Sequence, residues 1–326
     1  MRPFPSHGRG NFTHYFLDGI TPFTDEGHSA TLLLRNSKVF DNDERMKPHV
    51  ESGRAQLVQG DALVSDDVER SWEKATESGR IVDFVIFTIG ELRSNRSMYI
   101  PSNRAPVPIV GATPDMGSFK ITKGFTINPP NITTKAILNV FCTMPDSATR
   151  PKVIAITSIG VTKDSPIPVM LKPLYAYLLR GPHADKLGLE RVLAHASGRA
   201  WNDKEPREDL TTVDGVKWQD RKGLPSSGSF EVLVIRPPMF VEPKQKGVPP
   251  RSATPAVAPA TSQPSSGENE PQPKKKDGGE ELKYRFGGPE LSGTYSISRE
   301  EIAHFIVENA MKNWDQFKGK PITVSR

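Results

Sequence analysis

Cysteine is almost absent from this chain: Cys142 is the only one among 326 residues. A single cysteine excludes an intramolecular disulfide and favours a reducing compartment. No apolar run approaches the roughly 20 residues that span a bilayer. The first residues also lack the apolar stretch of a secretory signal. We therefore expect a cytoplasmic protein with no membrane partner.

Strong charge and recognisable ligand motifs are lacking as well. The formal net charge of +5 is small for this length, and the basic residues are scattered except for Lys274–Lys276. Without a basic stripe that carries aromatic residues, we expect no nucleic-acid partner. The histidines show no metal-ligand spacing. Neither the phosphate loop G-x-x-x-x-G-K-[ST] nor the nucleophile elbow G-x-S-x-G occurs, which argues against ATPases and hydrolases.

The chain does contain short, mostly apolar runs rich in β-branched residues, typical of parallel strands covered on both faces. These runs are Thr31–Arg35, Ile81–Ile89, Lys152–Thr157 and Phe230–Arg236. Helical patterns alternate with them, which indicates βαβ units and a parallel sheet. The hydrophobic content of 36% is enough for a substantial core. The expected fold class is therefore α/β, with helices on both faces of a parallel sheet.

Capping residues predict where the helices begin and end. Ser65 is the expected cap of a helix whose buried face carries Val68, Trp72 and Ala75, and Ser298 with Glu301 forms a capping-box pattern. The other expected elements are a short strand near Ala55–Val58, helices over Thr133–Met144 and Asp185–Ala196, and a last strand from Pro321.

Three segments interrupt this alternation. Residues 91–120 are rich in Pro, Gly, Asn and Ser, which predicts a loop near a site. Residues 200–228 are polar but contain Trp201 and Trp218, which predicts a segment folded over the surface. Residues 243–283 are rich in proline and lysine, and a segment that buries so little apolar surface is expected to be disordered.

Several short motifs occur in the order of the atypical short-chain dehydrogenase/reductases, a family that this chain resembles. The motifs are Arg35-Asn36, Gly60-Asp61-Ala62, Phe87-Thr-Ile-Gly90, Ile156-Thr-Ser158, Lys186-x-x-x-Glu190, Val234-Ile-Arg-Pro-Pro238 and Ile297-Ser-Arg-Glu-Glu-Ile-Ala303. Stretches such as Gly124–Asn131 and Leu171–Tyr175 are similar to fungal NAD(P)-binding-domain proteins of this type. The resemblance implies a Rossmann-like sheet that binds a nicotinamide dinucleotide at the carboxyl ends of its strands.

The chain departs from this family at its beginning. The family opens with an apolar strand and a glycine-rich turn, whereas residues 1–26 hold only Gly8-x-Gly10 with no strand before it. In the usual order the missing strand is central, so its loss affects folding as well as cofactor binding. A shortened or misassembled coding model would explain this pattern. We divide the chain into a divergent segment 1–26, a binding domain 27–242, a disordered insertion 243–283 and a completing segment 284–326.

The resemblance implies which residues hold the dinucleotide. Arg35, beside Asn36, would face the adenosine ribose, where a guanidinium suits a 2′-phosphate and favours NADP over NAD. Asp61 with Ala62 would lie by the adenine, and the small residue that ends Thr88-Ile89-Gly90 would let the dinucleotide approach the backbone. The alternatives are a solvated surface arginine, an aspartate in a turn and a glycine that simply ends a strand.

The residues implied for catalysis follow the next strands. Ser158 would orient the substrate carbonyl, and Lys186 would hold the nicotinamide ribose. The family's tyrosine is replaced by Pro182, so His183, with an expected near-neutral pKa, is the candidate proton donor. Pro237 would contact the nicotinamide amide through its backbone.

Each of these assignments has a structural alternative. Ser158 could cap the next segment, His183 could be a polar residue at a helix start, and Pro237 could terminate a strand. We expect Glu190 to pair on the helix surface. Gly181-Pro182 is expected to break any continuous helix between Tyr177 and Lys186.

The sequence thus predicts an NADP-dependent oxidoreductase or isomerase that acts on a small carbonyl-type substrate. The alternative is a non-catalytic protein that senses a dinucleotide or docks a partner, which the missing tyrosine and glycine-rich turn favour. A third possibility is a truncated product that has lost cofactor binding.

Overall fold

The structure is a computed structural model that describes residues 29–44, 46–89, 115–120, 124–146, 149–161, 177–201, 212–213, 216–241, 284–289, 291 and 293–326. The predictions made for the divergent segment 1–26 and for the disordered insertion 243–283 lie outside these residues, as do Gly90 and the region up to residue 114. The division into four segments therefore stays a prediction.

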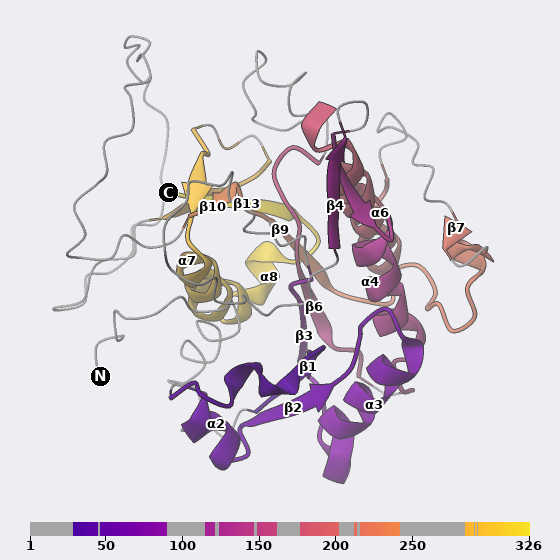
Figure 1. Cartoon of the computed structure of the whole chain (residues 1–326), viewed down its shortest axis with the longest axis vertical. Helices are drawn as coiled ribbons and strands as arrows, with labels where there is room; N and C mark the ends of the chain where they lie inside the picture. The colour runs from indigo at the N-terminus through magenta and orange to yellow at the C-terminus, as the bar shows by residue number, and fades with distance from the viewer. Residues whose placement is uncertain are drawn as a thin grey trace, which may run out of the picture.

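The larger sheet has five strands in the order β11-β13-β9-β6-β3. The strands are β3 (Phe84–Phe87), β6 (Lys152–Ile156), β9 (Val232–Arg236), β11 (Arg285–Gly287) and β13 (Pro321–Ser325). β3, β6, β9 and β13 pair in parallel, and only the edge strand β11 is antiparallel. Figure 1 shows this sheet running through the middle of the molecule. The predicted α/β class with a mainly parallel sheet is confirmed.

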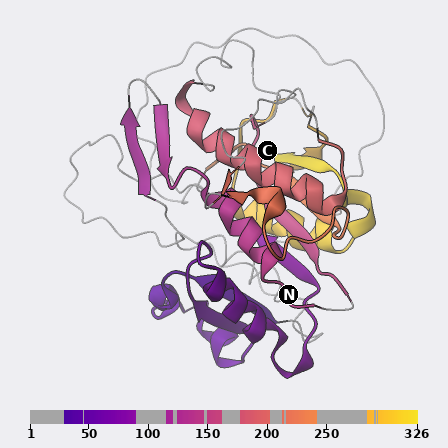
Figure 2. The same cartoon turned by 90° about the vertical axis from the view of Figure 1, so that its right-hand side faces the viewer.

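A second, two-stranded parallel sheet contains β1 (Ala30–Leu34) and β2 (Ala55–Gln59). Figures 1 and 2 show it at the β3 side of the larger sheet. The combined order β2-β1, then β3-β6-β9, matches positions 3-2 and 4-5-6 of the Rossmann order 3-2-1-4-5-6. Among the described strands, none occupies the central position between β1 and β3. Within the described strands, the sheet is therefore divided at the position of the family's first strand.

Helices cover both faces of the larger sheet, and each face has its own core. On one face, α4 (Ile132–Cys142) and α6 (Arg180–Ser197) pack over the strands with Phe141 and Leu193 in the core. On the other face lie α7 (Arg299–His304), the π-helix η6 (Phe305–Met311) and α8 (Trp314–Phe317). Phe305 and Phe317 stack there edge to face. Figure 1 shows these two helical layers on opposite sides of the sheet.

The smaller sheet is attached to the larger one through helices. α3 (Ser65–Thr76) follows β2 and packs against α4, where Trp72 Nε1 donates to the Val140 carbonyl at 3.2 Å. Asn139 in α4 is fully buried and donates to the Ala62 carbonyl at 2.7 Å. Its Oδ1 accepts hydrogen bonds from Ser65 and Arg221. Buried polar contacts therefore connect the β1–β2–α3 unit to α4.

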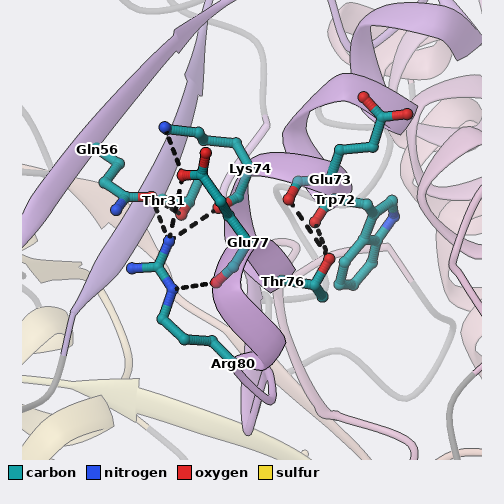
Figure 3. Close-up of polar contacts among 8 residues, drawn as sticks. All are labelled: Thr31, Gln56, Trp72, Glu73, Lys74, Thr76, Glu77 and Arg80. Atoms are coloured by element: carbon teal, nitrogen blue, oxygen red, sulfur yellow. Dashed lines mark hydrogen bonds and ion pairs between the residues drawn. The ribbon is translucent and has the colours of Figure 1, made fainter.

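Arg80 connects the end of α3 to β2 through hydrogen bonds (Figure 3). Its guanidinium donates to the carbonyls of Lys74 and Glu77 at 3.0 and 3.1 Å and to Gln56 Oε1 on β2 at 3.0 Å. The first two contacts satisfy carbonyls at the end of α3, and the third fixes that helix to the sheet.

Some helix boundaries confirm the capping patterns, and others correct them. Ser298 and Glu301 form the predicted capping box. Ser65, however, lies inside the first turn of α3, and the N-cap position is Val64, which makes no side-chain cap. α6 begins at Arg180 rather than Asp185, because a proline is tolerated in a first helical turn, where its missing N–H costs no intrahelical hydrogen bond. Gly181 and Pro182 lie inside α6, so the expectation that they break the helix is wrong, although Tyr177 does precede its first residue. Gly198 ends the helix with a φ of 69°.

Three segments differ from the sequence expectation. The predicted loop 91–120 contains strand β4 (Asp115–Lys120), which forms a hairpin with β5 (Gly124–Asn128) beside the N-terminal end of α6 (Figure 2). The predicted strand Ile81–Ile89 is shorter, since only Phe84–Phe87 pairs and Ile81 is 65% exposed. Trp218 is buried in the α6-side core instead of lying over the surface.

The remaining short elements connect these parts. They are η2 (Ser37–Phe40), α2 (Lys47–Glu51), η3 (Glu77–Gly79), β7 (Thr212–Val213), β8 (Val216–Lys217), η5 (Trp218–Asp220), β10 (Met239–Phe240) and β12 (Ser296–Ile297). β7 and β8 form an antiparallel pair, and β10 pairs in parallel with β12.

Candidate functional site

The sequence-predicted site residues follow the carboxyl ends of parallel strands. Parallel strands end at the same edge of a sheet, which is where open α/β proteins bind ligands. Arg35 and Asn36 follow β1, Asp61 and Ala62 follow β2, Thr88 and Ile89 follow β3, Ser158 follows β6 and Pro237 follows β9. The fold therefore places these residues along one edge, in two groups on either side of the position between β1 and β3.

Arg35 and Asp61 contact each other at the ends of β1 and β2. The Arg35 Nε lies 3.1 Å from Asp61 Oδ2, and Nη2 lies 3.4 Å from Oδ1. Asp61 Oδ1 also accepts from the Leu63 amide at 2.9 Å. The two side chains are 30% and 34% exposed, so both remain accessible to a ligand. The sequence assigned them to separate parts of the adenosine, whereas the structure joins them into one ion pair.

The backbone beneath this pair is held by the start of α3. The Asp61 amide donates to Asp67 Oδ2 at 2.6 Å, and this hydrogen bond, with the nearby Arg70, lowers the pKa of Asp67. A side chain at Gly60 would place its Cβ only 2.7 Å from the Asp67 Cβ, so only glycine fits there. Asn36 is exposed, and its Oδ1 accepts from the Lys38 amide at 3.0 Å as the cap of η2.

Ala62 and Ile89 were predicted to face the dinucleotide, but both side chains pack against the protein core. Both lie on the α6 side, which leaves Thr88 as the exposed residue at the end of β3. Gly90, the third residue of that predicted motif, lies outside the described residues.

Ser158 and Pro237 lie on adjacent segments beyond β6 and β9. The Ile159 amide donates to the Pro237 carbonyl at 3.0 Å, and the Thr157 amide donates to Ile235 at 2.8 Å. The Ser158 hydroxyl is partly buried and makes a local bond to the Ile159 carbonyl at 3.1 Å. The structure therefore brings these two predicted residues together, with Pro237 buried and Ser158 partly exposed.

Beneath these segments lies a buried polar cluster that the sequence did not predict. The Glu190 carboxylate is fully buried and accepts from Thr157 Oγ1 at 2.8 Å and from Arg236 Nε at 2.9 Å, with a second contact to Arg236 Nη2. The expectation that Glu190 pairs on the helix surface is therefore wrong. Arg199 lies nearby, and burial lowers its pKa against the opposing effect of Glu190. The sequence did contain one sign of this cluster, which is the arginine at the end of the apolar β9 run. A buried guanidinium requires a carboxylate partner, so this arginine indicates a buried acidic residue nearby.

His183 and Lys186 lie in the first two turns of α6. Burial and the nearby Lys186 lower the pKa of His183 to about 4, so its imidazole is neutral at pH 7. The near-neutral pKa expected from the sequence is therefore not observed, because the surroundings of the ring disfavour its charged form. Lys186 is partly buried, and no hydrogen bond or ion pair of its ammonium joins it to another described residue.

Asp185 anchors the same part of α6 to α4. Its buried carboxylate accepts from the Thr133 and Thr134 amides at 2.8 and 3.0 Å and from the Thr134 hydroxyl at 2.9 Å. These amides belong to the first turn of α4, where backbone donors have no partner within the helix. Burial raises the pKa of Asp185, and the hydrogen bonds oppose that rise.

The two ends of a nicotinamide dinucleotide find suitable residues here. The Arg35–Asp61 pair would offer a guanidinium and a carboxylate to one end. Lys186, whose ammonium bonds to no other residue in the described ranges, would offer a positive charge to the other end. A pyrophosphate is usually held by backbone amides of a glycine-rich turn. The described ranges contain no such turn. The described residues would therefore suit the two ends of the dinucleotide, and they include no group of this kind for its pyrophosphate.

No protein-family model and no curated protein sequence matches the chain. Among solved structures, it is similar to a Rossmann-fold NAD(P)-binding family protein from Shigella flexneri (TM-score 0.43, 11% identity, 97% of this chain and 89% of that one). It is also similar to the anaerobillin reductase ChuY from Escherichia coli O157:H7 (TM-score 0.44, 11% identity, 98% and 93%). A third is YwfH, an NADPH-dependent reductase of bacilysin biosynthesis (TM-score 0.42, 11% identity, 94% and 92%).

No helix in the described ranges is both long and apolar enough to cross a membrane. The same ranges contain no group of three or more side chains suited to hold a metal ion. The assignment of the architecture rests on strand order and direction. By that criterion the described part of the chain has a Rossmann-like α/β fold.

Proposed function

We propose that this chain binds a nicotinamide dinucleotide, NADP in preference to NAD, along the carboxyl edge of its parallel strands. The observation that carries the proposal is the partly exposed Arg35–Asp61 pair at the adjacent ends of β1 and β2. A guanidinium in this position suits the 2′-phosphate of NADP through paired hydrogen bonds, whereas NAD-binding sites use an acidic residue for the ribose hydroxyl.

The other residues take roles according to their place on this edge. Asp61 accepts from the adenine amino group, and the backbone at Thr88 lies along the dinucleotide. Lys186 donates to the nicotinamide ribose hydroxyls, and the backbone at Pro237 contacts the nicotinamide amide. These assignments place the adenosine beside the smaller sheet and the nicotinamide beside α6.

The proposed reaction is oxidoreduction or isomerisation of a small carbonyl-type substrate. When bound, the reduced nicotinamide supplies a hydride. The Ser158 hydroxyl orients the carbonyl oxygen, and His183 acts as a neutral imidazole whose N–H donates a hydrogen bond to it. Reduction of the carbonyl leaves an alkoxide oxygen, which takes its proton from solvent water. With a pKa of about 4, His183 polarises the carbonyl without being a cation at neutral pH.

A second candidate is a non-catalytic protein that senses a dinucleotide or docks a partner. The specific observation in its favour lies at the start of α6. Pro182 is buried where the family has its proton-donating tyrosine, and the neighbouring His183 becomes a cation only in acid, because its pKa is lowered to about 4. In this case the dinucleotide binds but no carbonyl substrate turns over.

We propose that the ligand of this site is a small molecule. We also propose that the protein is located in the cytoplasm. The single cysteine supports a reducing compartment. The net charge is small and the basic residues are scattered along the chain, which supports the absence of a nucleic-acid partner.

A thermal-shift titration with NADPH and with NADH tests dinucleotide binding. At one hundred times the dissociation constant, a ligand adds roughly 2.7 kcal/mol to the unfolding free energy, which raises Tm by roughly 5–10 °C for a domain of this size. We expect the larger shift with NADPH. A cooperative melt that neither dinucleotide moves would refute the proposal.

Two variants that each remove one positive charge test whether the 2′-phosphate binds at Arg35. Arg35→Gln removes the guanidinium at the carboxyl end of β1, and we expect it to abolish the preference for NADPH. Arg54→Gln removes a guanidinium just before β2, at the opposite edge of the same sheet. It should leave that preference unchanged. Equal effects of the two substitutions would point to a general charge effect rather than a site.

A further inference from the structure

A single buried carboxylate contacts both strands that lead to the proposed nicotinamide end. Glu190 on α6 accepts from Thr157 at 2.8 Å and from Arg236 Nε at 2.9 Å. All three side chains are almost completely buried, at 0%, 4% and 6% exposure. Thr157 directly follows β6, and Arg236 is the last residue of β9. The cluster therefore joins one helix to the ends of two neighbouring strands.

The residues next in sequence to this cluster are the ones assigned to ligand binding. Ser158 follows Thr157, Pro237 follows Arg236, and Lys186 lies one helical turn before Glu190. The Ile159 amide donates to the Pro237 carbonyl at 3.0 Å, immediately above the cluster. A shift of the carboxylate would consequently move Ser158, Pro237 and Lys186 relative to one another.

Stability alone does not require charged groups at this position. Apolar residues of similar volume often stabilise a protein as well as a buried ion pair does, because the desolvation of two charges offsets much of their attraction. The ion pair does restrict the relative orientation of the segments that it joins, because each hydrogen bond fixes an angle as well as a distance.

We propose that Glu190 is a positioning residue that sets the geometry of the Ser158 and Pro237 segments relative to Lys186. This inference rests on the proposed dinucleotide site. Glu190 itself does not contact the ligand in this proposal, and it acts only through Thr157 and Arg236. Its removal should thus weaken binding at the nicotinamide end even where the fold retains its stability.

The test uses the full chain and a variant that replaces the whole cluster with apolar groups, Thr157→Val/Glu190→Met/Arg236→Met. Three quantities are measured: Tm, the dissociation constant for NADPH, and hydrogen-exchange protection of the Ile159 amide. We expect a Tm near that of the original chain, loss of protection at Ile159, and NADPH binding weakened about tenfold or more, because small displacements of positioning groups have large effects. A stable variant that keeps both the protection and the affinity would overturn the proposal.

A second variant applies if the triple variant does not melt cooperatively. Glu190→Gln keeps the shape and one acceptor but leaves Arg236 without its counter-charge. Loss of protection at Ile159 with the buried Ile154 amide still protected supports positioning. Equal loss at both amides shows general destabilisation and contradicts it.

Glu301→Gln provides the matched control. Glu301 is also a buried carboxylate, 1% exposed, and contacts Arg326 at 2.7 Å on the other face of the sheet. We expect a lower Tm with unchanged NADPH affinity and unchanged Ile159 protection. If this control weakens NADPH binding as much as the cluster variants do, the positioning role is refuted. If the original chain binds neither dinucleotide, the proposed function fails, and the Ile159 protection still decides the positioning role.

Discussion

At the scale of single residues, His183 shows how burial changes the role of a side chain. An exposed histidine titrates near pH 6.5, but the burial of this ring and the positive charge of Lys186 lower its pKa to about 4. The unfolded chain therefore binds a proton at a pH where the native chain does not. The native state is stabilised above pH 6.5 by this difference, and the stabilisation is lost as the pH falls from 6.5 toward 4.

We therefore expect the unfolding free energy to fall as the pH decreases below 6.5. For the original chain, His183 should account for about 3 kcal/mol of the unfolding free energy lost between pH 6.5 and pH 4. His183→Gln, which does not titrate, should make the curve flatter in that interval. Denaturant unfolding at several pH values measures this. An unchanged slope in the variant would show that the imidazole is not held neutral in the fold.

At the scale of elements, α4 depends on a residue from another helix for its N-terminal cap. The amides of Thr133 and Thr134 donate to Asp185 of α6, which thereby also fixes α6 beside α4. Helix starts need such acceptors because their first amides have no partner within the helix. The contact places the first turns of α6, with His183 and Lys186, against a fixed neighbour.

Asp185→Ala should reduce the unfolding free energy by about 3 kcal/mol, because it leaves buried amides without acceptors. Asp185→Asn keeps one carbonyl oxygen and should cost less. Chemical denaturation of both variants gives the two values. Equal losses would mean that the shape of the side chain, rather than its acceptors, holds the two helices together.

Arg80 has a comparable role at the end of α3 (Figure 3). It is 35% exposed and bonds two carbonyls at the helix end together with Gln56 of β2. Its ion pair with Glu77 is long, at 4.0 Å, and partly exposed pairs of this kind add little to stability. The carbonyl contacts are therefore the important ones at this helix end.

At the scale of the whole molecule, the described sheet consists of two parts joined by helix contacts. β1 pairs only with β2, and β3 pairs only with β6, among the strands that the structure describes. The buried Asn139 connects the parts through Ala62 and Ser65. Sheet hydrogen bonds, which normally transmit cooperativity across a Rossmann fold, do not cross this boundary within the described strands.

Asn139→Leu should therefore loosen the smaller sheet selectively. The substitution removes the hydrogen bonds to Ala62 and Ser65 and leaves their polar groups without this partner, at a cost of about 2 kcal/mol. We expect faster hydrogen exchange at β1 and β2 amides with little change at β6. Thr143→Val, which removes only a hydroxyl bond to the Asn139 carbonyl within α4, is the control. Uniformly faster exchange in all three strands would indicate a single cooperative unit instead.

Local patterns in the sequence determined much of this molecule. Apolar runs predicted the strands from Thr31 to Arg236 because burial on both faces requires such runs. The capping box at Ser298 was predictable since its partners lie within one turn. The edge at which Arg35, Asp61, Ser158 and Pro237 lie also follows from sequence, because parallel strands end at a common edge.

Contacts between distant residues were decided only by the tertiary structure. The pairing of Arg35 with Asp61, the burial of Glu190 beside Arg236 and the position of Trp218 in the core depend on how helices pack on strands. Each joins segments far apart in the chain, so no local spacing encodes it. The same holds for the lowered pKa of His183, because desolvation depends on all the atoms that surround the ring in the fold.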